Sequence, residues 1–433
     1  MTAVSRAQEA LQSAHASQPR INAFTLVEDG EALAAAEKVD ALINSGRYAG
    51  PLAGVPIAVK DLIDHEGRVT TCGSAFYREE ATTSATCISR LERAGATIIG
   101  RTGLHEWAFG FSSENPHFGP VRNPWDPSTS PGGSSGGSGA AVAAGITPIA
   151  IGTDTGGSVR VPAALCGVFG LKVTHGRVPL DGVFPLVPSA DTVGPIANSV
   201  DGIDLAYRTM SGDDTPQPEP GPMTVGVPAP WTDEAPMESE IGDAFEATIA
   251  SLSDVGHRVV PIRLEGAIPN RNLVYSIADE VTAIHREFRA AGKPYGEDVA
   301  RRLDEAEGVT ESQKKEASDW RLMIKERFGD AFTRVDLLVT PTVPARRKAI
   351  GEEMIGGRHH RAVLSYFTAL VNQALHPAIA MPLARSGSPP ASLQAIGPMG
   401  SEAQLIGFAR GLESEGVVGF SPPPESSTIT GDG

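Results

Sequence analysis

Two clusters of glycine and serine stand out as residues that can do chemistry. The first is GGSSGG at 132–137 and the second is GTDTGGS at 152–158, with nine glycines between Gly132 and Gly157. An apolar run, PIAIG at 148–152, lies between them and excludes a flexible Gly/Ser linker. Neither cluster is followed by Gly-Lys-Ser/Thr, and the G-x-G-x-x-G spacing of a dinucleotide site is missing. A phosphate-binding loop is therefore the weaker alternative to an acyl-transfer site.

Ser158 has the position of a nucleophile for acyl transfer. It follows the predicted strand PIAIG and opens a predicted helix, SVRVPAALCG at 158–167. We expect this turn to direct the main-chain N–H groups of four residues into one space: Thr155, Gly156, Gly157 and Ser158. Converging N–H groups form an oxyanion hole, in which each lost donor costs ~3 kcal/mol of barrier.

A serine nucleophile needs a base, and the chain offers a lysine rather than a histidine. The ten histidines are scattered, and the best of them, His105 and His376, are more typical of structural or surface residues. Lys60 ends the apolar run GVPIAVKD at 54–61, with Asp61 and Asp64 close by. As a base it needs its pKa lowered by about three units, roughly 4 kcal/mol. Burial without a carboxylate partner can supply that shift.

Together these segments resemble the amidase signature family. The likeness rests on the two clusters, on the lysine of GVPIAVKD, and on the loop SSENPHFGPVRNPWDPSTSPGG at 112–133. The two serines of the clusters stand 24 positions apart, as the family requires. The resemblance is strong from about residue 50 to 200, thin through 200–335, and returns weakly in LLVTPT and SLQAIG. It implies amide hydrolysis in which Ser158 attacks, Ser134 relays the proton and Lys60 accepts it. In the family the relay serine follows a cis peptide bond.

Family positions also assign supporting residues. Ser135, Asp154 and Arg160 match such positions, and we expect them to hold the loops of the site. Arg160 can fork across carbonyls or Asp154, or it can instead meet a substrate carboxylate. Cys166 matches a frequent family position and indicates packing rather than chemistry.

The acyl pocket of the family is lined by a loop that reads WAFG here: Trp107, Ala108, Phe109 and Gly110. Ala108 leaves room, and the two rings favour a flat or apolar acyl group. Two departures from the family pattern also fall at substrate-facing positions. Gly103 stands where an asparagine is common, and Leu375 where a glycine often precedes a His-Pro pair.

The alternation of helices and strands predicts an α/β fold in a single domain, and the resemblance implies a central mixed β-sheet covered by helices on both faces. We expect an amidase domain over 1–420, with a helical N-terminal segment (1–48), a core (50–230), a helical insertion (about 238–335) and C-terminal strands and a helix (336–415). Predicted strands include 54–61, 96–100, 257–264, 336–342, 377–382 and 391–397. The tail, 421–433, is predicted to be disordered.

Composition limits the partners. The formal net charge of −16 argues against nucleic acid, and the longest apolar runs are too short to span a membrane. Three cysteines in an odd count, without metal spacing, favour a reduced cytoplasmic setting. We predict no metal, no cofactor and a small-molecule amide as the partner, with a homodimer as the assembly considered.

Two alternative functions stay open. One is the A subunit of glutamyl-tRNA(Gln) amidotransferase, which shares this core and passes ammonia to a partner. Against it, 433 residues is short for that protein, and the region around VARRLDEAEGVTESQKKEASDW does not resemble its glutamine-recognising segment. The other is a non-catalytic or nucleotide-binding scaffold, which would make the Lys–Ser–Ser set a coincidence.

Overall fold

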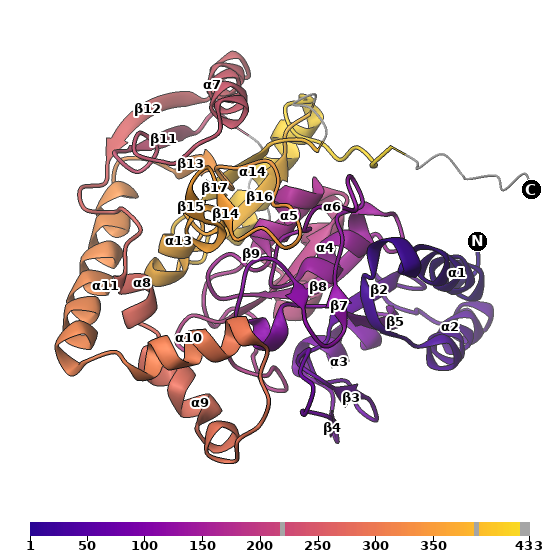
Figure 1. Ribbon diagram of the computed structural model, residues 1–433. Coiled ribbons are helices and arrows are strands. Elements are labelled where there is room, and N and C mark those ends of the chain that lie inside the picture. Colours follow the sequence, from indigo (N-terminus) through magenta and orange to yellow (C-terminus); the bar gives the residue numbers. More distant parts are fainter. Residues whose placement is uncertain (217–220, 385–388, 425–433) are drawn as a thin grey trace, which may run out of the picture.

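The computed structural model describes residues 1–216, 221–384 and 389–424. Its main feature is a mixed sheet of eleven strands (Figure 1). Strand β2 runs parallel to both β5 and β8, and β11 runs parallel to both β12 and β13, whereas all other neighbours are antiparallel. In sheet order the strands are β1 (Phe24–Val27), β5 (Thr97–Thr102), β2 (Pro56–Lys60), β8 (Ile149–Asp154), β10 (Thr192–Ala197), β9 (Phe169–Lys172), β16 (Ala378–Pro382), β17 (Ser392–Ile396), β13 (Leu337–Pro341), β11 (Thr224–Ala229) and β12 (Arg258–Arg263).

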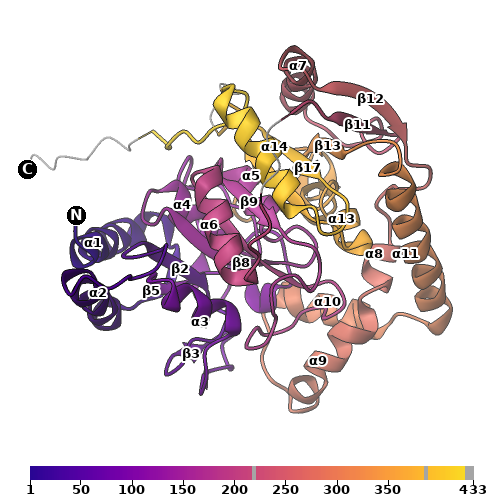
Figure 2. The same cartoon turned by 180° about the vertical axis from the view of Figure 1, so that it is seen from behind.

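Helices cover both faces of this sheet. On one face lie α3 (Thr86–Arg93), α6 (Val200–Ser211) and α14 (Glu402–Ser414), the last two side by side in Figure 2. On the other lie α1 (Ala3–Ile21), α4 (Gly136–Ala143) and α5 (Arg160–Cys166), with α2 (Asp29–Asn44) packed on α1. Successive side chains of a strand point to opposite faces. Ile57 and Val59 therefore enter the first core, and Ala58 enters the second. The predicted fold class is confirmed.

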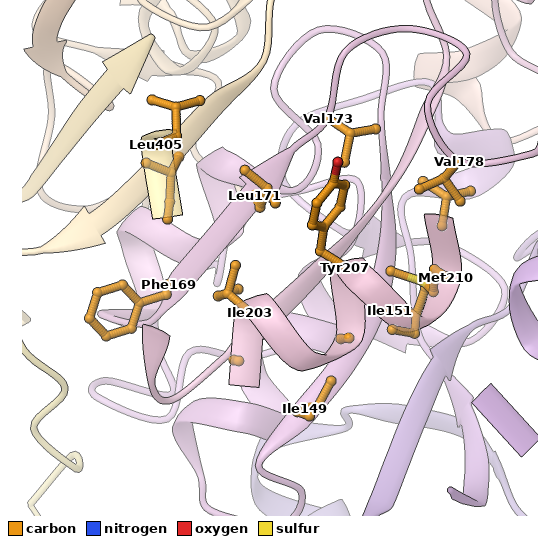
Figure 3. Packing of buried hydrophobic residues seen from close by; sticks show 14 of the residues in the cluster. Ile149, Ile151, Phe169, Leu171, Val173, Val178, Ile203, Tyr207, Met210 and Leu405 are labelled. Carbon is orange, nitrogen blue, oxygen red and sulfur yellow. The ribbon is translucent and has the colours of Figure 1, made fainter. Parts of the chain in front are cut away.

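The two cores differ in the size of their side chains. Under α6, Ile149 and Ile151 of β8 meet Leu171 of β9 and Ile203 and Met210 of the helix (Figure 3). Under α4 the helix contributes the small residues of 140–143, all at most 1% exposed. Small side chains let a helix approach a sheet closely. The residues just before α4 are thereby brought against the ends of β2 and β8.

Between β12 and β13 the chain forms a run of helices, called the helical lobe below (Figure 1), and its last helix packs in one apolar cluster with strands at this end of the sheet. It contains α8 (Asn272–Tyr275), α9 (Ala278–Ala290), α10 (Glu297–Glu307) and α11 (Glu311–Ala331). A capping box of Thr310 and Gln313 begins α11. Part of the predicted insertion belongs to the sheet region instead, because α7 (Ser239–Asp254) packs on β12 and β13.

Short elements complete the chain. They are the hairpins β3–β4 (Val69–Thr70, Glu79–Glu80), β6–β7 (Glu114–Asn115, Gly119–Pro120) and β14–β15 (Met354–Ile355, Arg358–His359), the single turn η1 (Glu106–Ala108), α12 (His360–Leu364) and α13 (Ala369–Ala374). The predicted strands at 54–61, 96–100, 257–264, 336–342, 377–382 and 391–397 are confirmed as β2, β5, β12, β13, β16 and β17. Strands β9, β10 and β11 lacked a clear pattern and were missed.

Residues 421–424 at the start of the predicted disordered tail have no helix or strand, and 425–433 lie outside the described residues. Across the described part of the chain, no helix joins the length and the apolar character needed to cross a bilayer.

Candidate active site

Lys60 is buried at the end of β2, between β5 and β8. Its Nζ donates to the Ser134 hydroxyl at 2.7 Å and to the Thr153 hydroxyl at 2.7 Å. Burial lowers the pKa of Lys60 to about 7, although the carboxylates of Asp154 and Asp191 act in the opposite direction. A substantial neutral fraction of the amine therefore exists near neutral pH.

The two aspartates closest to Lys60 in sequence do not pair with it. Asp61 is 1% exposed and accepts from the Thr71 hydroxyl at 2.5 Å. Asp64 accepts from the Thr70 hydroxyl at 2.7 Å. Because both carboxylates are engaged elsewhere, neither contributes a direct ion pair that would hold Lys60 protonated.

Ser134 stands two residues before α4, after a cis Gly133–Ser134 peptide bond. Its carbonyl oxygen accepts from the His105 N–H at 3.1 Å. The next residue, Ser135, donates its N–H to the Ser158 carbonyl at 3.2 Å. The backbones of the two catalytic candidates are thus joined. Within the described residues, however, the Ser134 and Ser158 hydroxyls do not hydrogen-bond each other.

Residues 155–158, called the oxyanion loop below, follow β8 directly. Gly157 has φ +133, and a Cβ there would lie 2.2 Å from the Thr368 hydroxyl, so only glycine fits. Its N–H, predicted to serve the oxyanion hole, donates to Asp154 Oδ1 at 2.8 Å. Among the described residues, the N–H groups of the other three loop positions have no protein acceptor. They belong to Thr155, Gly156 and Ser158.

The Asp154–Arg160 pair holds the base of this loop. Arg160 is fully buried, and its Nε and Nη2 donate to the two carboxylate oxygens at 2.9 Å each. Nη1 donates to Gln394 at 2.7 Å and Nη2 also donates to Asn372 at 2.6 Å. Burial alone would raise the pKa of Asp154, but the guanidinium outweighs it and the pKa is lowered. The loop-holding role of Arg160 stays a prediction, supported by these contacts.

Ser135 also contacts the end of β8. Its hydroxyl donates to the Thr153 carbonyl and accepts from the Thr153 N–H, both at 3.2 Å. Gly152 makes room for this contact, because a Cβ there would lie 2.7 Å from the Ser135 hydroxyl. Cys166 is buried, and its Sγ lies 3.5 Å from the Pro131 carbonyl, a packing position as expected.

The WAFG loop has an unusual backbone and a covered tryptophan. Trp107 and Ala108 have φ values of 56° and 58°. Trp107 is only 1% exposed, because aromatic rings surround it. The ring centroids of Phe76, Phe184 and Phe288 lie 4.9–5.6 Å from the centroid of its own ring. Phe109 lies 5.4 Å from the Arg302 guanidinium. A side chain at Gly110 would collide with the His105 imidazole at 2.3 Å. The role of this loop as the acyl pocket stays a prediction.

A cavity of about 290 Å³ lies beside this loop, between it and α10. The lining includes the side chains of His105, Glu106, Glu297 and Asp298. None of the three triad candidates, nor any residue of 107–110, is among the described residues that line it. This cavity is therefore separate from the Lys60 contacts.

The two histidines considered as bases occupy structural positions. His105 Nε2 lies 3.2 Å from Asp298 Oδ2, and burial lowers the pKa of this histidine. His376 Nδ1 lies 3.0 Å from the Gly397 carbonyl, and its ring stacks on Phe328. In the described chain neither imidazole hydrogen-bonds Ser134 or Ser158.

Sequence reasoning missed several residues of this site. Thr153, the second acceptor for Lys60, lies inside the quoted GTDTGGS motif and was given no role. Asn372 and Gln394 come from α13 and β17, more than 200 residues from Arg160, and short-range patterns carry no signal for them. Asp191 was also missed. It lies at the end of the segment between β9 and β10 and accepts a hydrogen bond from Thr155 of the oxyanion loop.

Known proteins confirm the family. The family model described as Amidase matches residues 6–406. The chain belongs to the amidase signature family. It is 36% identical to the A subunit of glutamyl-tRNA(Gln) amidotransferase from Chloroflexus aurantiacus, over 94% of this chain and 92% of that protein. A solved amidase superposes with a TM-score of 0.91, at 31% identity over 96% of both chains. A chain from a vestigial protein complex, linked to the origins of an s-triazine catabolic enzyme, gives 0.90 at 32% identity over 97% of both. The activity of this chain is that of an amidohydrolase acting on carbon–nitrogen bonds.

The expectation about partners is wrong. We expected a small-molecule amide as the partner, no nucleic acid and no membrane, with a homodimer as the assembly considered. The relatives named as A subunits belong to an amidotransferase of several subunits, and one similar structure is a protein complex. The sequence could not show this, because composition and net charge do not report protein–protein contacts.

Proposed function

We propose that this protein is the amide-hydrolysing component of an assembly with other protein subunits, and that it releases ammonia from a carboxamide such as glutamine. The observation that carries the hydrolytic part is the buried Lys60–Ser134 contact of 2.7 Å. The partner-dependent part is supported by the likeness to the A subunits of amidotransferases over nearly the whole chain. This function replaces the self-contained hydrolase as the first candidate.

The proposed reaction begins when the Ser158 hydroxyl attacks the amide carbonyl carbon. Its proton passes to the Ser134 oxygen, while the Ser134 proton passes to neutral Lys60. A hydroxyl can relay in this way because it both donates and accepts. For this step the Ser134 and Ser158 side chains must come into hydrogen-bond contact. The developing oxyanion is then stabilised by free N–H groups of the oxyanion loop, which is worth about 3 kcal/mol per donor.

Collapse of the tetrahedral intermediate breaks the carbon–nitrogen bond. The proton held by Lys60 returns through Ser134 to the leaving nitrogen, so that ammonia departs rather than an amide anion. An acyl ester remains on Ser158. Water, deprotonated along the same Ser134–Lys60 path, attacks this ester and gives the carboxylic acid and free enzyme.

A self-contained amidase is the second candidate, favoured by one observation. The solved amidase gives a TM-score of 0.91, whereas the solved amidotransferase A subunit from Thermotoga maritima gives 0.79 at 29% identity. The two candidates share the triad and differ in the amide used and in the need for partners.

The test uses the full chain in two preparations. In one it is purified alone, and in the other it is tagged and isolated from its native host together with the proteins that bind it. A fluorophosphonate is added and the adduct is located by mass spectrometry, with the prediction that it lies on Ser158. An adduct on Ser134 or Ser135 would contradict the assignment. Ammonia release from glutamine and from small aliphatic and aromatic amides is then measured. The first candidate predicts glutamine hydrolysis that rises with the co-purified subunits. Full activity of the isolated chain on small amides, with none on glutamine, would favour the second.

A further inference from the structure

Asp191 is a buried carboxylate that the proposed reaction does not use, and it lies against the oxyanion loop. Its side chain is 6% exposed. Oδ1 accepts from the Thr155 hydroxyl at 2.5 Å. Oδ2 accepts from the N–H groups of Leu186 and Val187 at 2.9 and 3.0 Å. Asp191 thereby joins the oxyanion loop to the segment between β9 and β10.

That segment is in turn fixed by the helical lobe. The N–H and the hydroxyl of Ser189 donate to the two oxygens of Glu280, on α9, at 2.8 and 2.6 Å. Arg321, on α11, donates to the Ser189 hydroxyl and carbonyl at 3.0 and 2.9 Å. The lobe therefore holds Ser189 by hydrogen bonds, the main chain of 189–191 leads from Ser189 to Asp191, and Asp191 holds Thr155 by a hydrogen bond.

The oxyanion loop needs such an anchor. Gly156 and Gly157 give it backbone freedom that other residues would not, whereas an oxyanion hole works only when its donors are held in place beforehand. The Thr368 hydroxyl fixes one point, by donating to the Gly156 carbonyl at 2.7 Å. At the start of the loop, the hydrogen bond from the Thr155 hydroxyl to Asp191 has the same fixing role.

We propose that Asp191 is a positioning residue, which holds the oxyanion loop through Thr155 and relays to it the position of the helical lobe through Ser189. This inference rests on the proposed function, since it concerns the same site. Its role is separate from that of Asp154, whose carboxylate is engaged by Arg160.

Asp191 also acts electrostatically on Lys60. The ionisable groups that raise the pKa of this lysine are Asp154, Asp191 and Cys72. Asp191 itself faces one hydroxyl, two N–H groups and, at longer range, the Glu280 carboxylate. Removing its charge should therefore make Lys60 easier to deprotonate.

The first test separates the hydroxyl contact from the charge. Thr155→Val keeps a β-branched side chain but removes the hydroxyl, and we expect kcat to fall about ten- to a hundredfold with little change in KM. Thr155→Ser should restore most of that loss. Asp191→Asn keeps a hydrogen-bonding side chain without the charge. It should move the midpoint of the kcat–pH profile to lower pH, whereas Thr155→Val should leave the midpoint in place.

The second test addresses the link to the lobe. Ser189→Ala removes the hydroxyl bonded to Glu280 and Arg321, and we expect a smaller fall in kcat. Ser211→Ala is the matched control, because that hydroxyl is also hydrogen-bonded, to the Tyr207 carbonyl at 2.7 Å, but lies at the end of α6. The control should keep the wild-type kcat.

Labelling of Ser158 by a fluorophosphonate separates the possible failures. If the wild type labels at Ser158 and the Thr155→Val, Asp191→Asn and Ser189→Ala variants all keep its kcat and pH midpoint, the positioning role is wrong while the proposed function stands. If the wild type itself does not label at Ser158, the proposed function fails first. Loss of kcat in equal measure in Ser189→Ala and Ser211→Ala would contradict the link to the lobe.

Discussion

Two fully buried lysines lie at strand ends in this protein, and they differ in what surrounds the amine. Burial lowers the pKa of both Lys60 and Lys172 to about 7. Lys60 donates to two hydroxyls, whereas Lys172 donates to the carbonyls of Val173 and His376 at 3.1 and 2.7 Å. A hydroxyl can pass a proton on, but a carbonyl oxygen can only accept a hydrogen bond. Burial and a lowered pKa are therefore not enough to identify a base, and the partner atoms decide.

The largest effect that this comparison predicts is on turnover. Lys60→Ala should lower kcat on an amide by about 10²- to 10⁴-fold, because Ser158 loses its base and the leaving nitrogen loses its proton donor. Esters should lose less, since an alkoxide leaves more easily. Lys60→Arg should not restore the rate, because a guanidinium stays protonated. Steady-state ammonia release checks this. Near-normal turnover of Lys60→Ala, with activity lost in a histidine variant such as His105→Ala, would rule out the lysine as base.

The sequence predicted the role of Lys60, but it did not predict that Lys172 is buried. The glycine clusters and the family interval pointed to Lys60, Ser134 and Ser158, and periodicity predicted β2 and β8 around them. No residue type near Lys172 in the sequence indicated a buried amine, because both of its acceptors are main-chain carbonyls, which any residue carries. Asn372, Gln394 and Asp191 were missed for a different reason, because their long-range side-chain contacts follow from packing.

For Lys172 we predict a change in stability without a change in mechanism. Above about pH 10.5, where the lysine of the unfolded chain is mostly neutral as well, Lys172→Met should lower the free energy of unfolding by about 1–3 kcal/mol, because the carbonyls of Val173 and His376 lose a buried donor. The folded enzyme should keep its kcat. Urea denaturation and active-site titration measure the two quantities on one preparation. If Lys172→Met lost as much kcat per labelled active site as Lys60→Ala, the proposed difference between the two lysines would be wrong.

A smaller, shared effect concerns the pH dependence of stability. Both lysines have a folded-state pKa of about 7, against an ordinary value of 10.5. Between these values the unfolded chain binds more protons, so the free energy of unfolding should rise with pH. Each lysine should add up to about 1.4 kcal/mol per pH unit. Lys60→Ala and Lys172→Met should each flatten the slope between about pH 7.5 and 9.5 relative to wild type. An unchanged slope in either variant would mean that its lysine is not held neutral by the fold.

The central claim, that Lys60 activates Ser158, is tested most directly by the pH dependence of acylation. The rate of fluorophosphonate labelling is followed by stopped flow in the wild type, Lys60→Ala and Lys172→Met, and the adduct is located by mass spectrometry. The wild type and Lys172→Met should label at Ser158 with rates that rise with pH around a midpoint near 7, as burial of Lys60 predicts. Lys60→Ala should label slowly and without that midpoint. A Lys60→Ala profile that matches the wild type in rate and midpoint would contradict the account.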